Sequence, residues 1–130
     1  MAEAEDIIPT FFVADVRRSV VWYETFLGFR TTFLYEEAGE GASYAGVEWG
    51  PVRIHLARRT PPPGTVFKGA CYLRLKSGVD DFVASILARG QPLVAALKTH
   101  EYGMREATVR DPDGNDVYIG QEVARSRATP

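Results

Sequence analysis

The chain has 130 residues, the length of one domain or of two fused half-domains that share a core. Its net charge of −2 argues against a nucleic-acid partner, because phosphate binding requires a basic face. No apolar run reaches the roughly 20 residues that a membrane span needs, and the acidic start lacks the features of a signal peptide. We therefore expect a cytoplasmic protein without a membrane partner.

The first half of the chain predicts a strand, a helix and three further strands. The helix is the clearest element, because Asp15 is a suitable N-cap and Gly28 provides the left-handed residue that ends many helices. Between these two residues the apolar side chains have the spacing of one helical face: Val16, Val20, Tyr23 and Leu27. The strands expected in this half occupy residues 7–14, 29–35, 43–49 and 52–57.

The second half repeats this order after a proline-rich segment. Residues 61–64 read Pro-Pro-Pro-Gly, which no regular element tolerates, so residues 61–68 are expected to form a linker. Beyond it we expect a strand over 69–76, a helix over 79–88 that ends at Gly90, and strands over 93–99, 104–110 and 115–121. The predicted units are a first module (1–60), the linker, a second module (69–124) and a loose tail (125–130).

The last two strands have the clearest hairpin pattern. Pro112 presets the backbone for a tight turn, while Gly114 and Asn115 tolerate a positive φ. On either side of the turn, apolar residues recur at a period of two and give each strand one buried face: Ala107, Val109, Val117 and Ile119. Because an isolated hairpin is marginal in water, this one must complete a larger sheet.

Two stretches carry a family pattern. The first runs from Val13-Ala14-Asp15-Val16 through Trp22-Tyr23-Glu24 to Leu27-Gly28-Phe29, and the second from Tyr102-Gly103-Met104-Arg105-Glu106 to Arg110-Asp111-Pro112-Asp113-Gly114-Asn115. Together they resemble the vicinal oxygen chelate superfamily of glyoxalases, extradiol dioxygenases and bleomycin-resistance proteins. Ile8-Pro9-Thr10 and Tyr102-Gly103 look most like the bleomycin-resistance branch. The resemblance covers about residues 7–122.

The resemblance implies an α+β fold in which two βαβββ modules form a cup-shaped mixed sheet with the helices outside. Strand alternation independently predicts which side chains face the cavity. They are Arg53, His55 and Ala57 in one strand, Ala70, Tyr72 and Arg74 in another, and Tyr118 in the last strand. Cys71 falls on the apolar face and is not expected to act as a nucleophile, because burial raises the pKa of a thiol.

The resemblance places the metal positions of catalytic members at Ile8, His55, Ala70 and Tyr118. A catalytic cation site needs about three protein ligands with imidazole or carboxylate donors. Ile8 and Ala70 offer no donor and Tyr118 is a poor ligand at neutral pH, which leaves His55, with Glu106 on a neighbouring strand as a helper. We therefore expect no metal, no other cofactor and no catalytic residue.

Pockets for flat organic ligands are apolar and aromatic, with a few polar groups that fix orientation. The predicted ligand-binding residues have that character: Phe33, Tyr44, Trp49, His55, Tyr72, Tyr102, Met104, Glu106 and Tyr118. The resemblance matches Phe33 and Tyr102 to positions where bleomycin-binding relatives place aromatic rings against the drug. Core packing is the alternative for each ring, and a hydrogen-bonded position within the strand is the alternative for His55.

The charge of the ligand stays open. Bleomycin-type drugs are cationic, and Arg53 and Arg74 on the cavity face would repel them unless paired with Glu48 or Glu106. An anionic or neutral ligand suits the predicted cavity equally well.

The leading hypothesis is a non-enzymatic protein that binds and sequesters a small aromatic or glycopeptide antibiotic of the bleomycin type. The alternative is a lyase, isomerase or dioxygenase of the same superfamily, with or without a metal, that uses Glu106 or His55 in acid–base chemistry. A third hypothesis is a degenerate module whose function is its dimer surface. The resemblance implies a homodimer with sites at the subunit interface, and Pro9 stands where the first strand could be exchanged between subunits.

Overall fold

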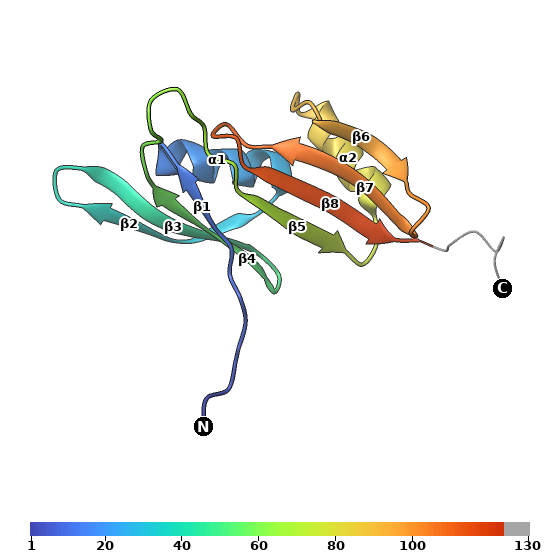
Figure 1. Cartoon of the computed structure of the whole chain (residues 1–130), viewed down its shortest axis with the longest axis horizontal. Helices are drawn as coiled ribbons and strands as arrows, with labels where there is room; N and C mark the ends of the chain where they lie inside the picture. The colour runs from blue at the N-terminus through green and yellow to red at the C-terminus, as the bar shows by residue number, and fades with distance from the viewer. Residues whose placement is uncertain (124–130) are drawn as a thin grey trace.

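The computed structural model describes residues 1–123 and contains two four-stranded sheets, each packed against one helix (Figure 1). The elements of the first module are β1 (Thr10–Val13), α1 (Val16–Leu27), β2 (Arg30–Glu37), β3 (Gly41–Trp49) and β4 (Val52–Arg58). Those of the second module are β5 (Ala70–Leu75), α2 (Val79–Ala88), β6 (Ala95–Thr99), β7 (Met104–Arg110) and β8 (Asp116–Glu122). The predicted tail at 125–130 lies outside the described residues.

The two sheets have the same topology. Sheet A has the order β1-β4-β3-β2 and sheet B the order β5-β8-β7-β6. In each sheet the first strand of the module runs parallel to the last one, and the other pairs are antiparallel. This repeated βαβββ arrangement confirms the predicted α+β fold, while the division of the chain at residues 61–68 stays a prediction.

Helix α1 has the predicted boundaries for the predicted reasons. The backbone N–H of Arg18 donates to the Asp15 carboxylate at 3.0 Å, and Gly28 ends the helix with a φ of 73°. The predicted apolar face is buried against the sheet: Val16, Val20, Tyr23 and Leu27. Helix α2 also has the predicted limits, although Arg89 is its C-cap and Gly90 follows in the left-handed region.

Several strand ends differ from the prediction. β1 begins at Thr10 instead of residue 7, after Pro9, which has no backbone N–H to contribute to a ladder. β2 continues through Glu36 and Glu37, which were predicted to lie in a loop, because both pair with the start of β3. β6 begins at Ala95 instead of residue 93. These differences change no side-chain face.

The turn between β7 and β8 is a buried hydrogen-bonded network. Asp111 is 4% exposed, and its Oδ1 accepts from the backbone N–H groups of Asp113 and Asn115, at 2.9 Å each. Its Oδ2 accepts from the Tyr23 hydroxyl on α1 and from the Asn115 side chain, at 3.0 Å each. Both carboxylate oxygens are therefore occupied within the fold.

The same turn joins the two modules. The Asn115 amide donates to the Phe12 carbonyl at 3.1 Å and accepts from the Gly69 N–H at 3.0 Å. The Asp113 carboxylate accepts from the Ala14 N–H at 2.9 Å. The Asp-Pro-Asp-Gly-Asn motif thus fixes β1 and α1 of the first module to β5 and β8 of the second, and its role is structural.

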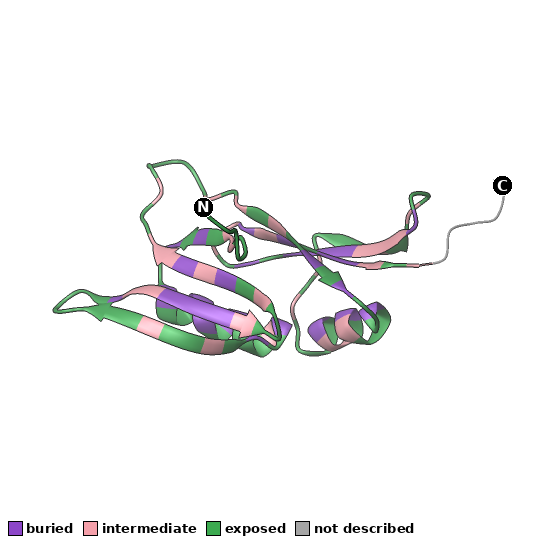
Figure 2. Ribbon diagram, turned by 90° about the horizontal axis from the view of Figure 1, so that it is seen from below, coloured by how far each residue is buried: buried purple, intermediate pink, exposed green. Residues whose placement is uncertain are grey.

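Within residues 1–123, each sheet has one face that no helix covers, which we call its open face. Both helices lie behind the strands in the view of Figure 1, and buried and exposed residues alternate along the strands in Figure 2. In β4, Ile54 and Leu56 are buried toward the helix side, and in β5 Leu73 and Leu75 are buried in the same way. The alternate residues therefore point to the open faces. No helix within residues 1–123 is long and apolar enough to cross a membrane.

Candidate ligand-binding site

Phe33, Tyr44 and His55 form one cluster on the open face of sheet A. The Tyr44 hydroxyl lies 2.8 Å from Nδ1 of His55. The Phe33 and His55 rings meet edge to face, with centroids 5.3 Å apart, and the Phe33 and Tyr44 rings stack at 5.9 Å. The three side chains come from the adjacent strands β2, β3 and β4, so the register of the sheet fixes their separation. We call them the sheet A cluster.

Gly46 provides the room for this cluster. It pairs with Phe33 on β2 and with His55 on β4. A Cβ atom at residue 46 would overlap with the Phe33 ring, so glycine allows that ring to lie across β3 toward His55. A glycine inside a strand often marks the close approach of another group, and this signal could have identified Gly46 from the sequence.

Glu106 is the centre of a second cluster, on the open face of sheet B. The Tyr72 hydroxyl donates to Oε2 at 2.5 Å, and the Tyr102 hydroxyl donates to Oε1. Nε2 of His100 lies 3.5 Å from Oε1, and the His100 ring stacks on Tyr102 with centroids 4.9 Å apart. We call these four residues the sheet B cluster. His100 was missed from the sequence, because it lies between β6 and β7, outside the alternating pattern.

The hydrogen bonds of the sheet B cluster hold Glu106 in its ionised form. Burial alone would raise its pKa, but the Tyr102 and Tyr72 hydroxyls and the nearby His100 outweigh burial and place the pKa below the ordinary value. Burial and the bond to Glu106 raise the pKa of Tyr72, and the bond to Glu106 raises the pKa of Tyr102. At neutral pH the carboxylate is therefore charged and both phenols keep their protons.

This lowered pKa predicts a pH dependence of stability. The folded chain binds the Glu106 proton less tightly than the unfolded chain does. The carboxylate's contribution is therefore complete above the ordinary pKa of 4.5 and is lost as the pH falls through the lowered value. Urea denaturation should show Glu106→Gln to be more destabilising at neutral pH than near pH 3. An equal effect at both pH values would contradict the assignment.

Gly120 has in sheet B the role that Gly46 has in sheet A. A Cβ atom at residue 120 would overlap with the Tyr72 hydroxyl, because that side chain crosses β8 to reach Glu106 on β7. Gly120→Ala should therefore displace Tyr72 and move the pKa of Glu106 upward, as measured by NMR titration of the carboxyl carbon. Gly46→Ala, in the other sheet, should leave that titration unchanged. An unaltered Glu106 titration in Gly120→Ala would contradict this placement of Tyr72.

Three other predicted site residues remain: Tyr118 and Met104 lie on strands of sheet B, and Trp49 lies on sheet A. Tyr118 pairs with Tyr72 across β5 and β8, and with Lys98, His100 and Glu106 it lines a cavity of about 430 Å³. Met104 lies on β7 two residues before Glu106 and is half-buried. Trp49 lies apart from both clusters.

Trp49 belongs to the helix side of sheet A. It stacks on Phe82 of α2, with ring centroids 5.1 Å apart, and meets Phe29 edge to face at 6.2 Å. Its register partner is Val52, on the same face as buried Ile54. The structure thus places Trp49 at the packing contact between modules, and it does not bring Trp49 together with the other predicted ligand-binding residues.

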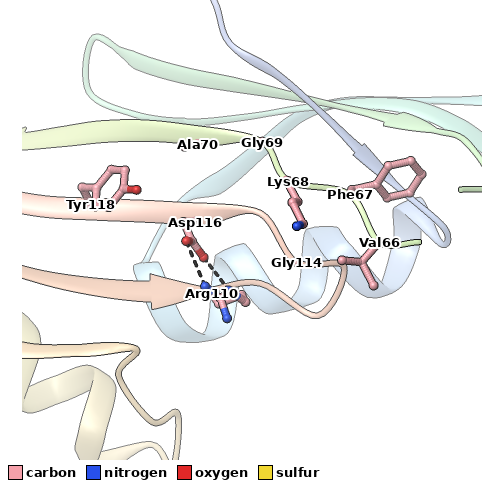
Figure 3. A pocket seen from close by; sticks show the side chains of 9 residues that line it. All are labelled: Val66, Phe67, Lys68, Gly69, Ala70, Arg110, Gly114, Asp116 and Tyr118. Carbon is pink, nitrogen blue, oxygen red and sulfur yellow. Dashed lines mark hydrogen bonds and ion pairs between the residues drawn. The ribbon is translucent and has the colours of Figure 1, made fainter. Parts of the chain in front are cut away.

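A second cavity, of about 380 Å³, opens between the segment before β5 and the β7–β8 hairpin (Figure 3). Arg110 and Asp116 at its wall form two hydrogen bonds of 2.7 and 3.1 Å, so each charge has a partner. Tyr118 is the predicted site residue that lines it. This cavity shares Tyr118 with the 430 Å³ cavity, but no member of either aromatic cluster lines it, and we do not assign it to the site.

A profile of the Glyoxalase/Bleomycin resistance protein/Dioxygenase superfamily matches residues 8–119. The chain belongs to this superfamily. No curated protein matches it by sequence.

Solved structures of the superfamily fold align over almost the whole chain. TioX from Micromonospora sp. ML1 has a TM-score of 0.77 at 19% identity, covering 92% of this chain and 100% of TioX. A bleomycin-binding protein complexed with bleomycin has a TM-score of 0.71 at 20% identity, with coverages of 92% and 99%. A bleomycin resistance determinant encoded on transposon Tn5 has a TM-score of 0.73 at 20% identity, with coverages of 92% and 98%. These likenesses establish the shared fold.

The residues at the superfamily's metal positions do not suit a divalent cation. The resemblance implied Ile8, His55, Ala70 and Tyr118 as these positions. In the sheets, the residue that pairs with His55 is Thr10, not Ile8, and the residue that pairs with Tyr118 is Tyr72, not Ala70. Nδ1 of His55 is already bonded to Tyr44. Within residues 1–123, no three His, Cys, Asp or Glu side chains lie close enough together to hold a metal ion.

Cys71 is not an alternative reactive group. Burial, with a smaller effect of Asp111, raises the pKa of its thiol to about 11. The thiolate is the nucleophilic form of cysteine, and a pKa this high leaves little of it at neutral pH.

Proposed function

We propose that this protein binds a small aromatic or glycopeptide molecule between the open faces of its sheets and holds it without converting it. The observation that supports this proposal most strongly is the exposure of large aromatic rings on those faces. Phe33 and Tyr118 are each 41% exposed, Tyr72 is 45% exposed and Tyr102 is 53% exposed. Exposed aromatic side chains that gather on one surface are typical of a binding site.

A second copy of the chain would complete the site. Ligand pockets bury most of the ligand surface, whereas each cluster faces away from the helices and has no cover among residues 1–123 of its own chain. Twofold symmetry could place the open face of sheet A over the open face of sheet B in the partner, which creates two equivalent sites. Each site would then combine the sheet A cluster of one subunit with the sheet B cluster of the other.

The acid–base groups support binding better than catalysis. A general base works best when its pKa lies near the working pH, whereas the pKa of Glu106 is lowered and those of Tyr72 and Tyr102 are raised. The Tyr44 hydroxyl occupies one nitrogen of His55. Sequestration requires only affinity and abundance, and it would protect a cytoplasm from an antibiotic.

The bleomycin-binding protein of the same fold makes bleomycin the first probe. Calorimetric titration should show saturable binding at a fixed stoichiometry, and mass spectrometry should recover the ligand unchanged. The enzyme alternative predicts conversion of a thiol adduct or a catechol in the presence of nickel, zinc, manganese or iron, with loss of that activity in His55→Ala. Conversion of this kind, or no binding across a panel of bleomycin-class and other aromatic antibiotics, would contradict the proposal.

A further inference from the structure

We infer that the ligand carries an amine or guanidine cation and that Glu106 on the open face of sheet B binds it. This inference rests on the proposed function and names the chemical class of its ligand. It is carried by the charges of Arg53, Arg74 and Glu106 on the two open faces, whose partners the structure shows individually.

The two arginines that would oppose a cationic ligand are both paired. Arg53 lies 3.3 Å from the Asp6 carboxylate and 4.0 Å from that of Glu48. Arg74 lies 2.7 Å from the Glu122 carboxylate. Their positive charges are therefore balanced by carboxylates of the same chain, and they present little net charge to a ligand.

Glu106 differs from those carboxylates because its hydrogen-bond donors are neutral phenols. Tyr72 and Tyr102 each donate to one of its oxygens, and among residues 1–123 His100 is the nearest group able to carry a positive charge, at 3.5 Å. No lysine or arginine within residues 1–123 forms an ion pair with it. A carboxylate can accept about four hydrogen bonds, and the Glu106 side chain is 18% exposed. It therefore has both acceptor capacity and access for a ligand.

The rings around Glu106 favour an organic cation over a metal ion. Tyr72 and Tyr102 are partly exposed and bond to the carboxylate, and the partly exposed Tyr118 lines the same cavity as Glu106. Aromatic faces attract ammonium and guanidinium groups. Calcium takes six to eight oxygen ligands, and within residues 1–123 no three His, Cys, Asp or Glu side chains lie close enough together to hold a metal ion. An anionic ligand would be repelled by the carboxylate, and a neutral ligand would gain no charge attraction from it.

Lys98, in the same cavity, allows a test with the opposite expected effect. It is the register partner of Glu106 on β6 and lines the 430 Å³ cavity with His100 and Tyr118. Its ammonium group would compete with a ligand cation for the carboxylate. Lys98→Gln should therefore strengthen binding of a cation, whereas Glu106→Gln should weaken it.

Three probes with the same ring and different charge test the inference: naphthylmethylammonium, the neutral naphthalenemethanol and naphthylacetate. In NMR titrations the ammonium compound should bind roughly tenfold more tightly than the alcohol, and the acetate should bind most weakly. Glu106→Gln should abolish this order, and Lys98→Gln should increase the ammonium affinity by about threefold. Asp80→Asn, on α2 behind the sheet, is the matched control and should preserve the order.

Equal or tighter binding of the acetate, no binding of the ammonium probe, or an unchanged order in folded Glu106→Gln would overturn the inference. If Glu106→Gln does not fold, the inference is overturned by an affinity for the ammonium probe that does not rise in Lys98→Gln. The proposed function fails separately, when no antibiotic in the panel binds or when one is converted. Binding of a neutral or anionic antibiotic with the acetate preferred would keep the function and remove the charge inference.

Discussion

Replacing Asp111 by asparagine should lower the free energy of unfolding by about 2–4 kcal/mol. The carboxylate is buried and accepts two backbone N–H groups on one oxygen and the Tyr23 hydroxyl and Asn115 amide on the other. An asparagine amide has one acceptor oxygen, so two buried donors lose their partner. Burial raises the pKa of Asp111, which means that charging it in the fold is unfavourable, and removing the charge offsets part of the loss.

Urea denaturation of the two proteins at neutral pH measures this difference. Asp80→Asn is the matched control, because the Asp80 side chain is 65% exposed and its ion pair with Arg105 lies at the surface. That variant should lose less than about 1 kcal/mol. Equal effects of the two substitutions would show that the β7–β8 turn does not join the modules as described.

Removing the aromatic ring of Phe33 or of Tyr102 should weaken ligand binding strongly. Phe33→Ala and Tyr102→Ala should each reduce the affinity for a bound bleomycin by about 1–3 kcal/mol, which corresponds to roughly fivefold to 150-fold. Phe33 holds the sheet A cluster over Gly46, and Tyr102 both donates to Glu106 and stacks on His100. Calorimetric titration of each variant measures the loss.

Trp49→Ala is the control for both rings. Its indole packs against Phe82 and Phe29 on the helix side, away from the two clusters. The substitution should lower the melting temperature and leave the affinity of the folded protein unchanged. Unchanged affinity in both Phe33→Ala and Tyr102→Ala would exclude these rings from the site, and a large affinity loss in Trp49→Ala would place the site elsewhere.

Local signals in the sequence predicted the fold well, because each acts over a few residues. Asp15 and Gly28 set the ends of α1, and alternation around the β7–β8 turn gave the buried face that the structure shows. The limits of β1 and β2 were less predictable. They depend on which partner strand continues the ladder, as Glu36 and Glu37 show by pairing with the start of β3.

The candidate site was predictable only in part. Alternation placed His55, Tyr72 and Tyr118 on the open faces, and the same reasoning applied to Val47 and Trp49 would have placed Trp49 on the helix side. The contacts of Glu106 were beyond such reasoning. They join β5, β7 and the β6–β7 connection, and they depend on Tyr72 crossing Gly120, which periodicity along one strand does not report.

A mixing experiment tests most directly whether the open faces of two copies form the site. Phe33→Ala and Tyr102→Ala homodimers each carry a damaged ring in both of their sites. In a heterodimer isolated with two affinity tags, one site would contain both damaged rings and the other would contain an intact Phe33 and an intact Tyr102. We expect calorimetry to find one site per heterodimer with the affinity of the unaltered protein. A heterodimer that binds bleomycin no better than the two homodimers would contradict the shared site.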